Sequence, residues 1–122
     1  MIIAKKLHDT ELMKNPHGLD ARNLYNAPSA KITVITLQPH ESLRPHITPV
    51  DVAFYVLRGQ GIVDIGDHSE LIGPDTLVES PKGIAHCWHN ESDEPLVLMV
   101  VKAPRPTEKT IFTDEMETTP RD

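Results

Sequence analysis

Short runs of alternating apolar and polar residues recur along most of the chain. The segment from Lys31 to Leu37 is rich in β-branched residues and predicts the first strand. Beyond it, Gly, Pro, Asn and Asp interrupt the sequence every eight to twelve residues. The runs between these turn signals predict strands at about 43–46, 52–58, 61–65, 69–72, 76–79, 85–90 and 96–102. No eleven-residue window there has a helical period, so the pattern predicts an all-β antiparallel sandwich or barrel.

The two ends of the chain lack this pattern. Residues 1–30 mix charges with two groups of turn-forming residues, at 15–18 and 27–30, and we expect an N-terminal arm that is partly extended, with one short strand. Residues 31–102 form the predicted barrel. Residues 103–122 are polar and contain prolines, and this tail cannot bury enough apolar surface to order by itself, although Ile111 and Phe112 can dock on the barrel. A chain of 122 residues suits one such domain.

Composition excludes several classes of partner. The 12 Lys and Arg against 18 Asp and Glu give a formal charge of −6, which argues against nucleic acid. The longest apolar run, Leu96 to Val101, is far shorter than the ~20 residues that a membrane span needs. The N-terminus has no apolar segment typical of a signal peptide, so we expect a cytoplasmic protein. A single cysteine, Cys87, excludes an internal disulfide framework.

One turn and the strand after it stand out as a candidate site. Pro81 and Gly83 are suited to a rigid turn, His86 follows inside an apolar strand, and Asn90 begins the next loop. A second histidine, His46, precedes another apolar segment that ends at Gly59. The spacing Pro-x-Gly-x2-His-x3-Asn, together with His46 and Gly59, resembles the paired motifs of the cupin family. The resemblance covers roughly residues 31–102.

The resemblance implies a fold, a metal and a ligand set. Cupins are small jelly-roll barrels, also described as double-stranded β-helices, in which three histidines and one glutamate bind a divalent ion. On that template His46 and His86 are retained, whereas Thr48 replaces one histidine and Val52, or Ala53 with a longer spacer, replaces the glutamate. The implied cofactor is therefore a divalent transition metal, such as Zn, Mn, Fe, Ni or Cu, in an incomplete site, with no organic cofactor.

Two neighbouring residues are further candidates for completing the coordination. Asp51 lies beside the glutamate position, but it points away from the pocket unless Pro49 introduces a bulge. His40 occupies the place of the first motif's leading glycine, in a loop.

Alternation along the strands assigns the remaining residues to faces. Trp88 shares the face of His86, and we expect it to line the pocket with Val52, Phe54 and Val56. Cys87 and His89 fall on the opposite face, where Cys87 is expected to be a small apolar residue and His89 a structural or exposed one. Tyr55 and Leu57 fall on the outer face of their strand, which is the face that the resemblance implies for a homodimer.

Three functions remain open from the sequence. The first is binding of a small polar molecule in the barrel, because ligand pockets are mostly apolar with few polar groups. The second is a metal-dependent enzyme of isomerase, epimerase or dioxygenase type, against which the missing carboxylate counts. The third is a structural or regulatory protein whose barrel has lost its site, and the retention of both His46 and His86 argues against it.

Overall fold

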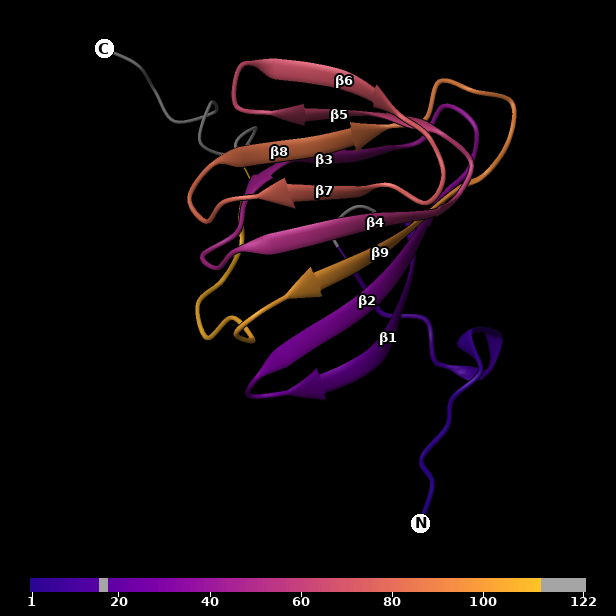
Figure 1. Ribbon diagram of the computed structural model, residues 1–122, viewed down its shortest axis with the longest axis vertical. Coiled ribbons are helices and arrows are strands. Elements are labelled where there is room, and N and C mark those ends of the chain that lie inside the picture. The colour runs from indigo at the N-terminus through magenta and orange to yellow at the C-terminus, as the bar shows by residue number, and fades with distance from the viewer. Residues whose placement is uncertain (16–17, 113–122) are drawn as a thin grey trace.

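The computed structural model describes residues 1–15 and 18–112, and within them the chain folds into two antiparallel sheets (Figure 1). One sheet has the order β1-β2-β9-β4-β7 and the other has the order β10-β3-β8-β5-β6. The strands are β1 (Asp20–Ala27), β2 (Ala30–Leu37), β3 (Ser42–Ile47), β4 (Val52–Arg58), β5 (Gly61–Ile65), β6 (His68–Ile72), β7 (Leu77–Ser80), β8 (Ala85–His89), β9 (Leu96–Lys102) and β10 (Ile111–Phe112). A short 3-10 turn, η1 (Leu7–Asp9), precedes them. The predicted all-β jelly roll is confirmed.

The N-terminal segment contains a longer strand than its sequence indicated. β1 spans eight residues and pairs with β2 through a tight turn in which Ala27 lies opposite Ala30. β1 is an edge strand whose residues are mostly half-buried or exposed, so its sequence lacks a clear apolar alternation. Pro28 and Ser29 form the hairpin turn, which explains why the turn signal there does not end the sheet.

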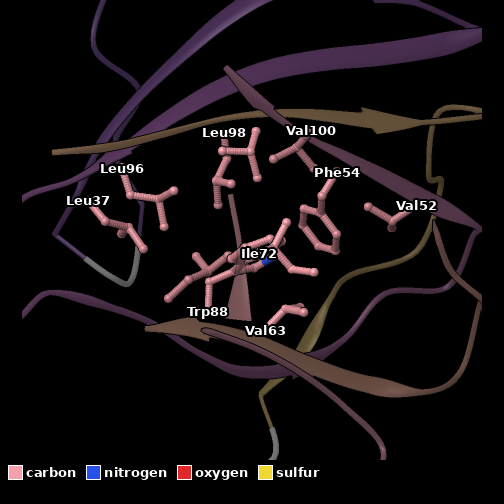
Figure 2. Close-up of a cluster of buried hydrophobic side chains, with 11 residues drawn as sticks. Leu37, Val52, Phe54, Val63, Ile72, Trp88, Leu96, Leu98 and Val100 are labelled. Atoms are coloured by element: carbon pink, nitrogen blue, oxygen red, sulfur yellow. The ribbon is translucent and has the colours of Figure 1, made fainter. Parts of the chain in front are cut away.

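The core lies between the two sheets. Figure 2 shows Trp88 and Val63 from one sheet facing Leu98 and Phe54 from the other. The rings of Phe54 and Trp88 meet edge to face with their centroids 5.5 Å apart, which is a favourable aromatic geometry. Eleven buried apolar side chains form this core in the described residues, enough to fill the barrel and to fix which face of each strand points inward.

Helical structure in the described part of the chain is confined to η1, and no helix there is long and apolar enough to cross a membrane.

Candidate functional site

The two motif histidines meet inside the barrel. His46 on β3 lies directly opposite His86 on β8 in the antiparallel register. Their Nε2 atoms are 3.0 Å apart and their rings are nearly perpendicular, with centroids 4.4 Å apart. Both side chains are buried, at 7% and 2% exposure. Strand pairing therefore brings together two residues that are forty positions apart in the sequence.

Hydrogen bonds orient both imidazoles. The Nδ1–H of His46 donates to the carbonyl oxygen of Arg44 at 2.7 Å, because a carbonyl can only accept. This bond is made across a bulge in β3, between Leu43 and His46. In the neutral ring, Nε2 of His46 is then the basic nitrogen, which can accept a proton or bind a metal.

The second imidazole has two hydroxyl neighbours. The Ser80 hydroxyl lies 2.6 Å from Nδ1 of His86, and the Thr48 hydroxyl lies 3.3 Å from its Nε2. Thr48 and Ser80 are each only 1% exposed, so these contacts are shielded from water. Because Nε2 of His46 accepts, the Nε2–H of neutral His86 donates to it at 3.0 Å, and the Ser80 hydroxyl donates to Nδ1. A hydroxyl can also accept, so Ser80 can hold the other tautomer of His86 when its Nε2 binds a metal.

Burial keeps both histidines neutral at neutral pH. Burial, followed by the proximity of His46 and of Lys102, lowers the pKa of His86 to about 3. Burial is also the main cause of the lowered pKa of His46, partly offset by its bond to the Arg44 carbonyl. Neutral imidazole is the form that binds transition metals.

A cavity of about 340 Å³ opens beside the histidine pair. Its described lining includes three lysines, Lys31, Lys102 and Lys109, and no aspartate or glutamate. Burial, followed by the charge of Lys31, lowers the pKa of Lys102. The remaining lining residues are mainly apolar, with a few amides and hydroxyls: Met13, Asn15, Leu19, Ala21, Thr33, Ile35, Leu43, His46, Val52, Phe54, His86, Val100, Thr110 and Phe112. The cavity is therefore apolar with a positive charge.

Two of the four residues expected around the pocket line this cavity. Val52 and Phe54 do so, and the Phe54 ring contacts His86 edge to face with centroids 5.1 Å apart. Val56 and Trp88 are fully buried in the core and are not among the lining residues. They lie farther along β4 and β8, where side chains of the two sheets fill the barrel.

The structure does not bring Asp51 or His40 to the histidine pair. The Asp51 carboxylate accepts a hydrogen bond from the backbone N–H of Lys82 at 2.9 Å, which ties it to the 81–83 turn. His40 is exposed in the loop before β3, where its backbone N–H donates to the Asn90 carbonyl. His46 is near the other end of β3. Neither residue lines the cavity.

Sequence reasoning missed the lysines, and although it allowed Ile111 and Phe112 to dock on the barrel, it did not place them at the cavity. β10 pairs with β3 so that Phe112 lies opposite His46, with ring centroids 5.7 Å apart. The Arg44 guanidinium lies 4.3 Å from the centre of the Phe112 ring. The alternation of β9 carried a signal for Lys102, since it shares the inward face of Leu98 and Val100. The apolar pair Ile111 and Phe112 signalled docking, but no local pattern indicated β3 as the partner, because that strand lies far away in the sequence.

Cys87 and His89 lie on the face of β8 opposite His86, as alternation predicted, and there they contact Asp64 of β5. Burial, followed by the hydrogen bond to Asp64, raises the pKa of the Cys87 thiol to about 12. The pKa of Asp64 is lowered, chiefly by a hydrogen bond from the Ser69 hydroxyl.

Solved structures share this fold. The TT1209 protein from Thermus thermophilus is 28% identical, with a TM-score of 0.72, over 84% of this chain and 98% of that one. The polyketide cyclase RemF from Streptomyces resistomycificus is 20% identical, with a TM-score of 0.79, over 92% of this chain and 85% of that one. The cupin domain of Schizosaccharomyces pombe Cnp3 is 17% identical, with a TM-score of 0.75, over 86% of this chain and 76% of that one.

The sequence itself gives the family assignment. No curated protein matches the chain significantly. The family model described as "Cupin domain" matches residues 33–102, which include both His46 and His86 and more than half of the sequence. The predicted resemblance is confirmed: the chain belongs to the cupin family.

Proposed function

We propose that the barrel binds a small organic anion, and that His46 and His86 hold a divalent transition metal beside it. The observation that carries this proposal is the composition of the cavity. Two neutral imidazoles and three lysines line it, and the described lining residues include no carboxylate. A ligand with a negative charge and oxygen donors supplies what this lining lacks.

The histidine pair suits two adjacent positions of a metal ion. Two imidazole nitrogens bound at about 2.0–2.1 Å lie roughly 2.9–3.4 Å apart, for angles between a right angle and the tetrahedral value. The observed Nε2 separation of 3.0 Å falls in this range. The hydrogen bond from His46 Nδ1–H to a backbone carbonyl is the kind of outer contact that orients metal-bound histidines. Zn, Mn, Fe, Ni and Cu all accept imidazole ligands.

The other coordination positions are left for the bound molecule and water. Thr48 offers only a neutral hydroxyl near His86, which is a weak ligand. A divalent cation beside three lysines is electrostatically unfavourable by itself, and an anionic ligand offsets that repulsion. A bound metal would supply Lewis-acid polarisation of the oxygen that it contacts.

The chemistry of the histidines and lysines in the cavity favours ligand binding over catalysis. A non-haem iron oxygenase site uses two histidines and one carboxylate, and Asp51 is held elsewhere by Lys82. General acid–base catalysis by His86 is disfavoured, because its pKa of about 3 lies far from neutral pH, where an effective acid or base has its pKa. The lysines are placed to bind an anion, so we assign the cavity to ligand binding.

Metal content is the first test. Untagged protein purified without chelator is analysed by inductively coupled plasma mass spectrometry, beside the His46→Ala/His86→Ala double variant and a His40→Ala control. We expect the wild type and the control to carry a metal that the double variant loses in part or whole. Equal metal in all three proteins would refute a site at the histidine pair.

Anion binding is tested separately with succinate, and with uncharged glycerol as the comparison. We expect succinate, and not glycerol, to shift the nuclear magnetic resonance signals of residues around Thr33, Phe54 and Val100. Lys102→Met should weaken succinate binding at least tenfold, whereas Lys6→Met, an exposed lysine outside the cavity, should leave it unchanged. Equal effects of glycerol and succinate would refute the anion preference.

We also propose a homodimer through the outer face of the first sheet. Leu57 and Leu77 are 43% and 56% exposed there, and Leu77 lies opposite Tyr55 in the β4–β7 pair. Burying these side chains against a second copy would remove apolar surface from water.

A further inference from the structure

A second group of metal-binding side chains lies on the outer face of β8, on the side opposite His86. Cys87 and His89 project from β8, and Asp64 of β5 lies directly opposite Cys87 in the strand register. We propose that Asp64, Cys87 and His89 form a second metal site, for a thiophilic divalent ion of the zinc class.

The three ligand atoms form a nearly equilateral triangle. Cys87 Sγ lies 3.2 Å from Asp64 Oδ2 and 3.3 Å from His89 Nε2, and the latter two atoms are 3.0 Å apart. Tetrahedral zinc with bonds of about 2.3 Å to sulfur and about 2.0 Å to nitrogen and oxygen separates such atoms by roughly 3.3–3.6 Å. Small side-chain shifts of a few tenths of an ångström, within rotamer freedom, would open the triangle to that size.

Hydrogen bonds with neighbouring serines already orient His89 and Asp64 toward the centre of the triangle. The Ser42 hydroxyl lies 3.0 Å from Nδ1 of His89, on the far side of the ring from Nε2. The Ser69 hydroxyl donates to Oδ1 of Asp64 and leaves Oδ2 toward the cysteine. Metal-bound histidines and carboxylates characteristically have such second partners. The residues come from four adjacent strands, β3, β8, β5 and β6, so the sheet backbone holds the arrangement.

The same distances argue against a nucleophilic triad. In a Cys–His–Asp triad the imidazole contacts the nucleophile through one nitrogen and the carboxylate through the other. Here the thiol and the carboxylate both approach Nε2 of His89, and Nδ1 faces Ser42. Convergence of sulfur, nitrogen and oxygen on one point is the arrangement of metal ligands.

The charges of the three ligands and the exposure of their side chains also suit a divalent ion. A thiolate and a carboxylate together offset the charge of a divalent ion, in contrast to the lysine-lined cavity. The side chains of His89 and Asp64 are 35% and 34% exposed, whereas Cys87 is buried, so an ion would reach the thiol from the side of the other two ligands. Binding must displace the thiol proton, which favours ions with high thiolate affinity over magnesium or calcium.

Cobalt provides a specific test, because Cys87 is the only cysteine in the chain. Full-length wild-type protein is stripped with chelator, reduced, and titrated with Co²⁺ under nitrogen. We expect a sulfur-to-cobalt charge-transfer band that saturates by two equivalents, one for each proposed site, and disappears when Zn²⁺ is added. Cobalt bound at His46 and His86 cannot give this band, so the result is independent of the proposed function.

Variants identify the ligands. Cys87→Ser should abolish the band, and Asp64→Asn and His89→Gln should weaken cobalt binding at least tenfold. Ser42→Ala, which removes an outer partner, should weaken it about tenfold or more. His68→Gln, an exposed histidine on β6, should change nothing. Absence of the band in the wild type, or unchanged affinity in both Asp64→Asn and His89→Gln, would overturn the proposal. Since Asp64 and His89 are partly exposed, their variants keep the test valid if Cys87→Ser fails to fold.

Discussion

Two glycines of the family motifs have the same backbone conformation and very different surroundings. Gly59 and Gly83 have φ values of +81° and +79°. A Cβ atom added at Gly59 would lie 2.2 Å from the backbone carbonyl oxygen of Pro95, whereas one added at Gly83 would meet nothing within 4 Å. Alanine at the two positions therefore separates the cost of the left-handed conformation from the cost of a collision.

The magnitudes follow from these surroundings. The left-handed conformation costs a non-glycine residue about 1–2 kcal/mol, and this is the whole cost expected for Gly83→Ala. In Gly59→Ala the backbone next to Leu96 must also move by about 1 Å to restore a normal contact. Leu96 is fully buried, and overpacking at such a position costs a further ~1–3 kcal/mol. We expect Gly59→Ala to cost about 2–5 kcal/mol in total.

Urea unfolding of both variants, followed by Trp88 fluorescence, measures the two free energies of unfolding. The urea dependence should match the wild type in both, so that midpoints report stability directly. Equal destabilisation by the two substitutions would refute the assignment of Gly59 to a close contact with the 95–96 backbone.

Three further predictions concern other positions. In chelator, folding stability should fall by at least about 2 kcal/mol from pH 7 to pH 5, because the pKa of His86 is about 3 when folded and about 6.5 when unfolded, so the unfolded chain binds more protons in that window. In urea melts His86→Gln should keep only the smaller part of this dependence that comes from the lowered pKa of His46, and His40→Gln should keep all of it. A pH-independent wild type contradicts the prediction. Asn90→Ala should lower the free energy of unfolding by about 3 kcal/mol in the same melts, because the buried side-chain amide of Asn90 donates hydrogen bonds to two backbone carbonyls. A loss below about 1 kcal/mol would count against that role. Tyr55→Asp should give monomers in light scattering, and an unchanged mass would rule out the proposed dimer face.

The strands were predictable because the barrel has one buried and one exposed face along much of its length. The predicted segments at 52–58, 61–65 and 96–102 coincide with β4, β5 and β9. Each is bounded by residues that favour turns, such as Gly59 and Pro95. β1 was predicted too short because it lies at a sheet edge, where burial does not impose alternation on the sequence.

The candidate site was predictable only where the family resemblance supplies contacts between distant strands. It predicted the pairing of His46 with His86, which no local pattern contains. It gave no information on β10, which lies outside the matched region and places Phe112 at the cavity. The position of Asp64 beside Cys87 depends on the β5–β8 register, so alternation alone made Cys87 an apolar residue with no assigned partner.

The register of β8 sets both proposed sites at once. Consecutive residues of a strand face opposite sides, so a slip of one residue would place Cys87 in the cavity and His86 outside. The ends of the strand prevent this. At the start, the backbone N–H of Gly83 donates to the carbonyl of Thr48, and at the end the Asn90 amide donates to the carbonyls of Leu37 and Glu94.

These end contacts give a physical role to the motif residues that carry no metal chemistry. Gly83 permits a left-handed turn, and Asn90 replaces backbone hydrogen bonds that the following loop cannot make by itself. Both act on β8 as a unit, so loosening either end should weaken the inner and the outer site together. A variant such as Asn90→Ala that remains folded should therefore lose affinity for succinate and for cobalt in parallel, whereas Lys102→Met should affect the succinate site alone.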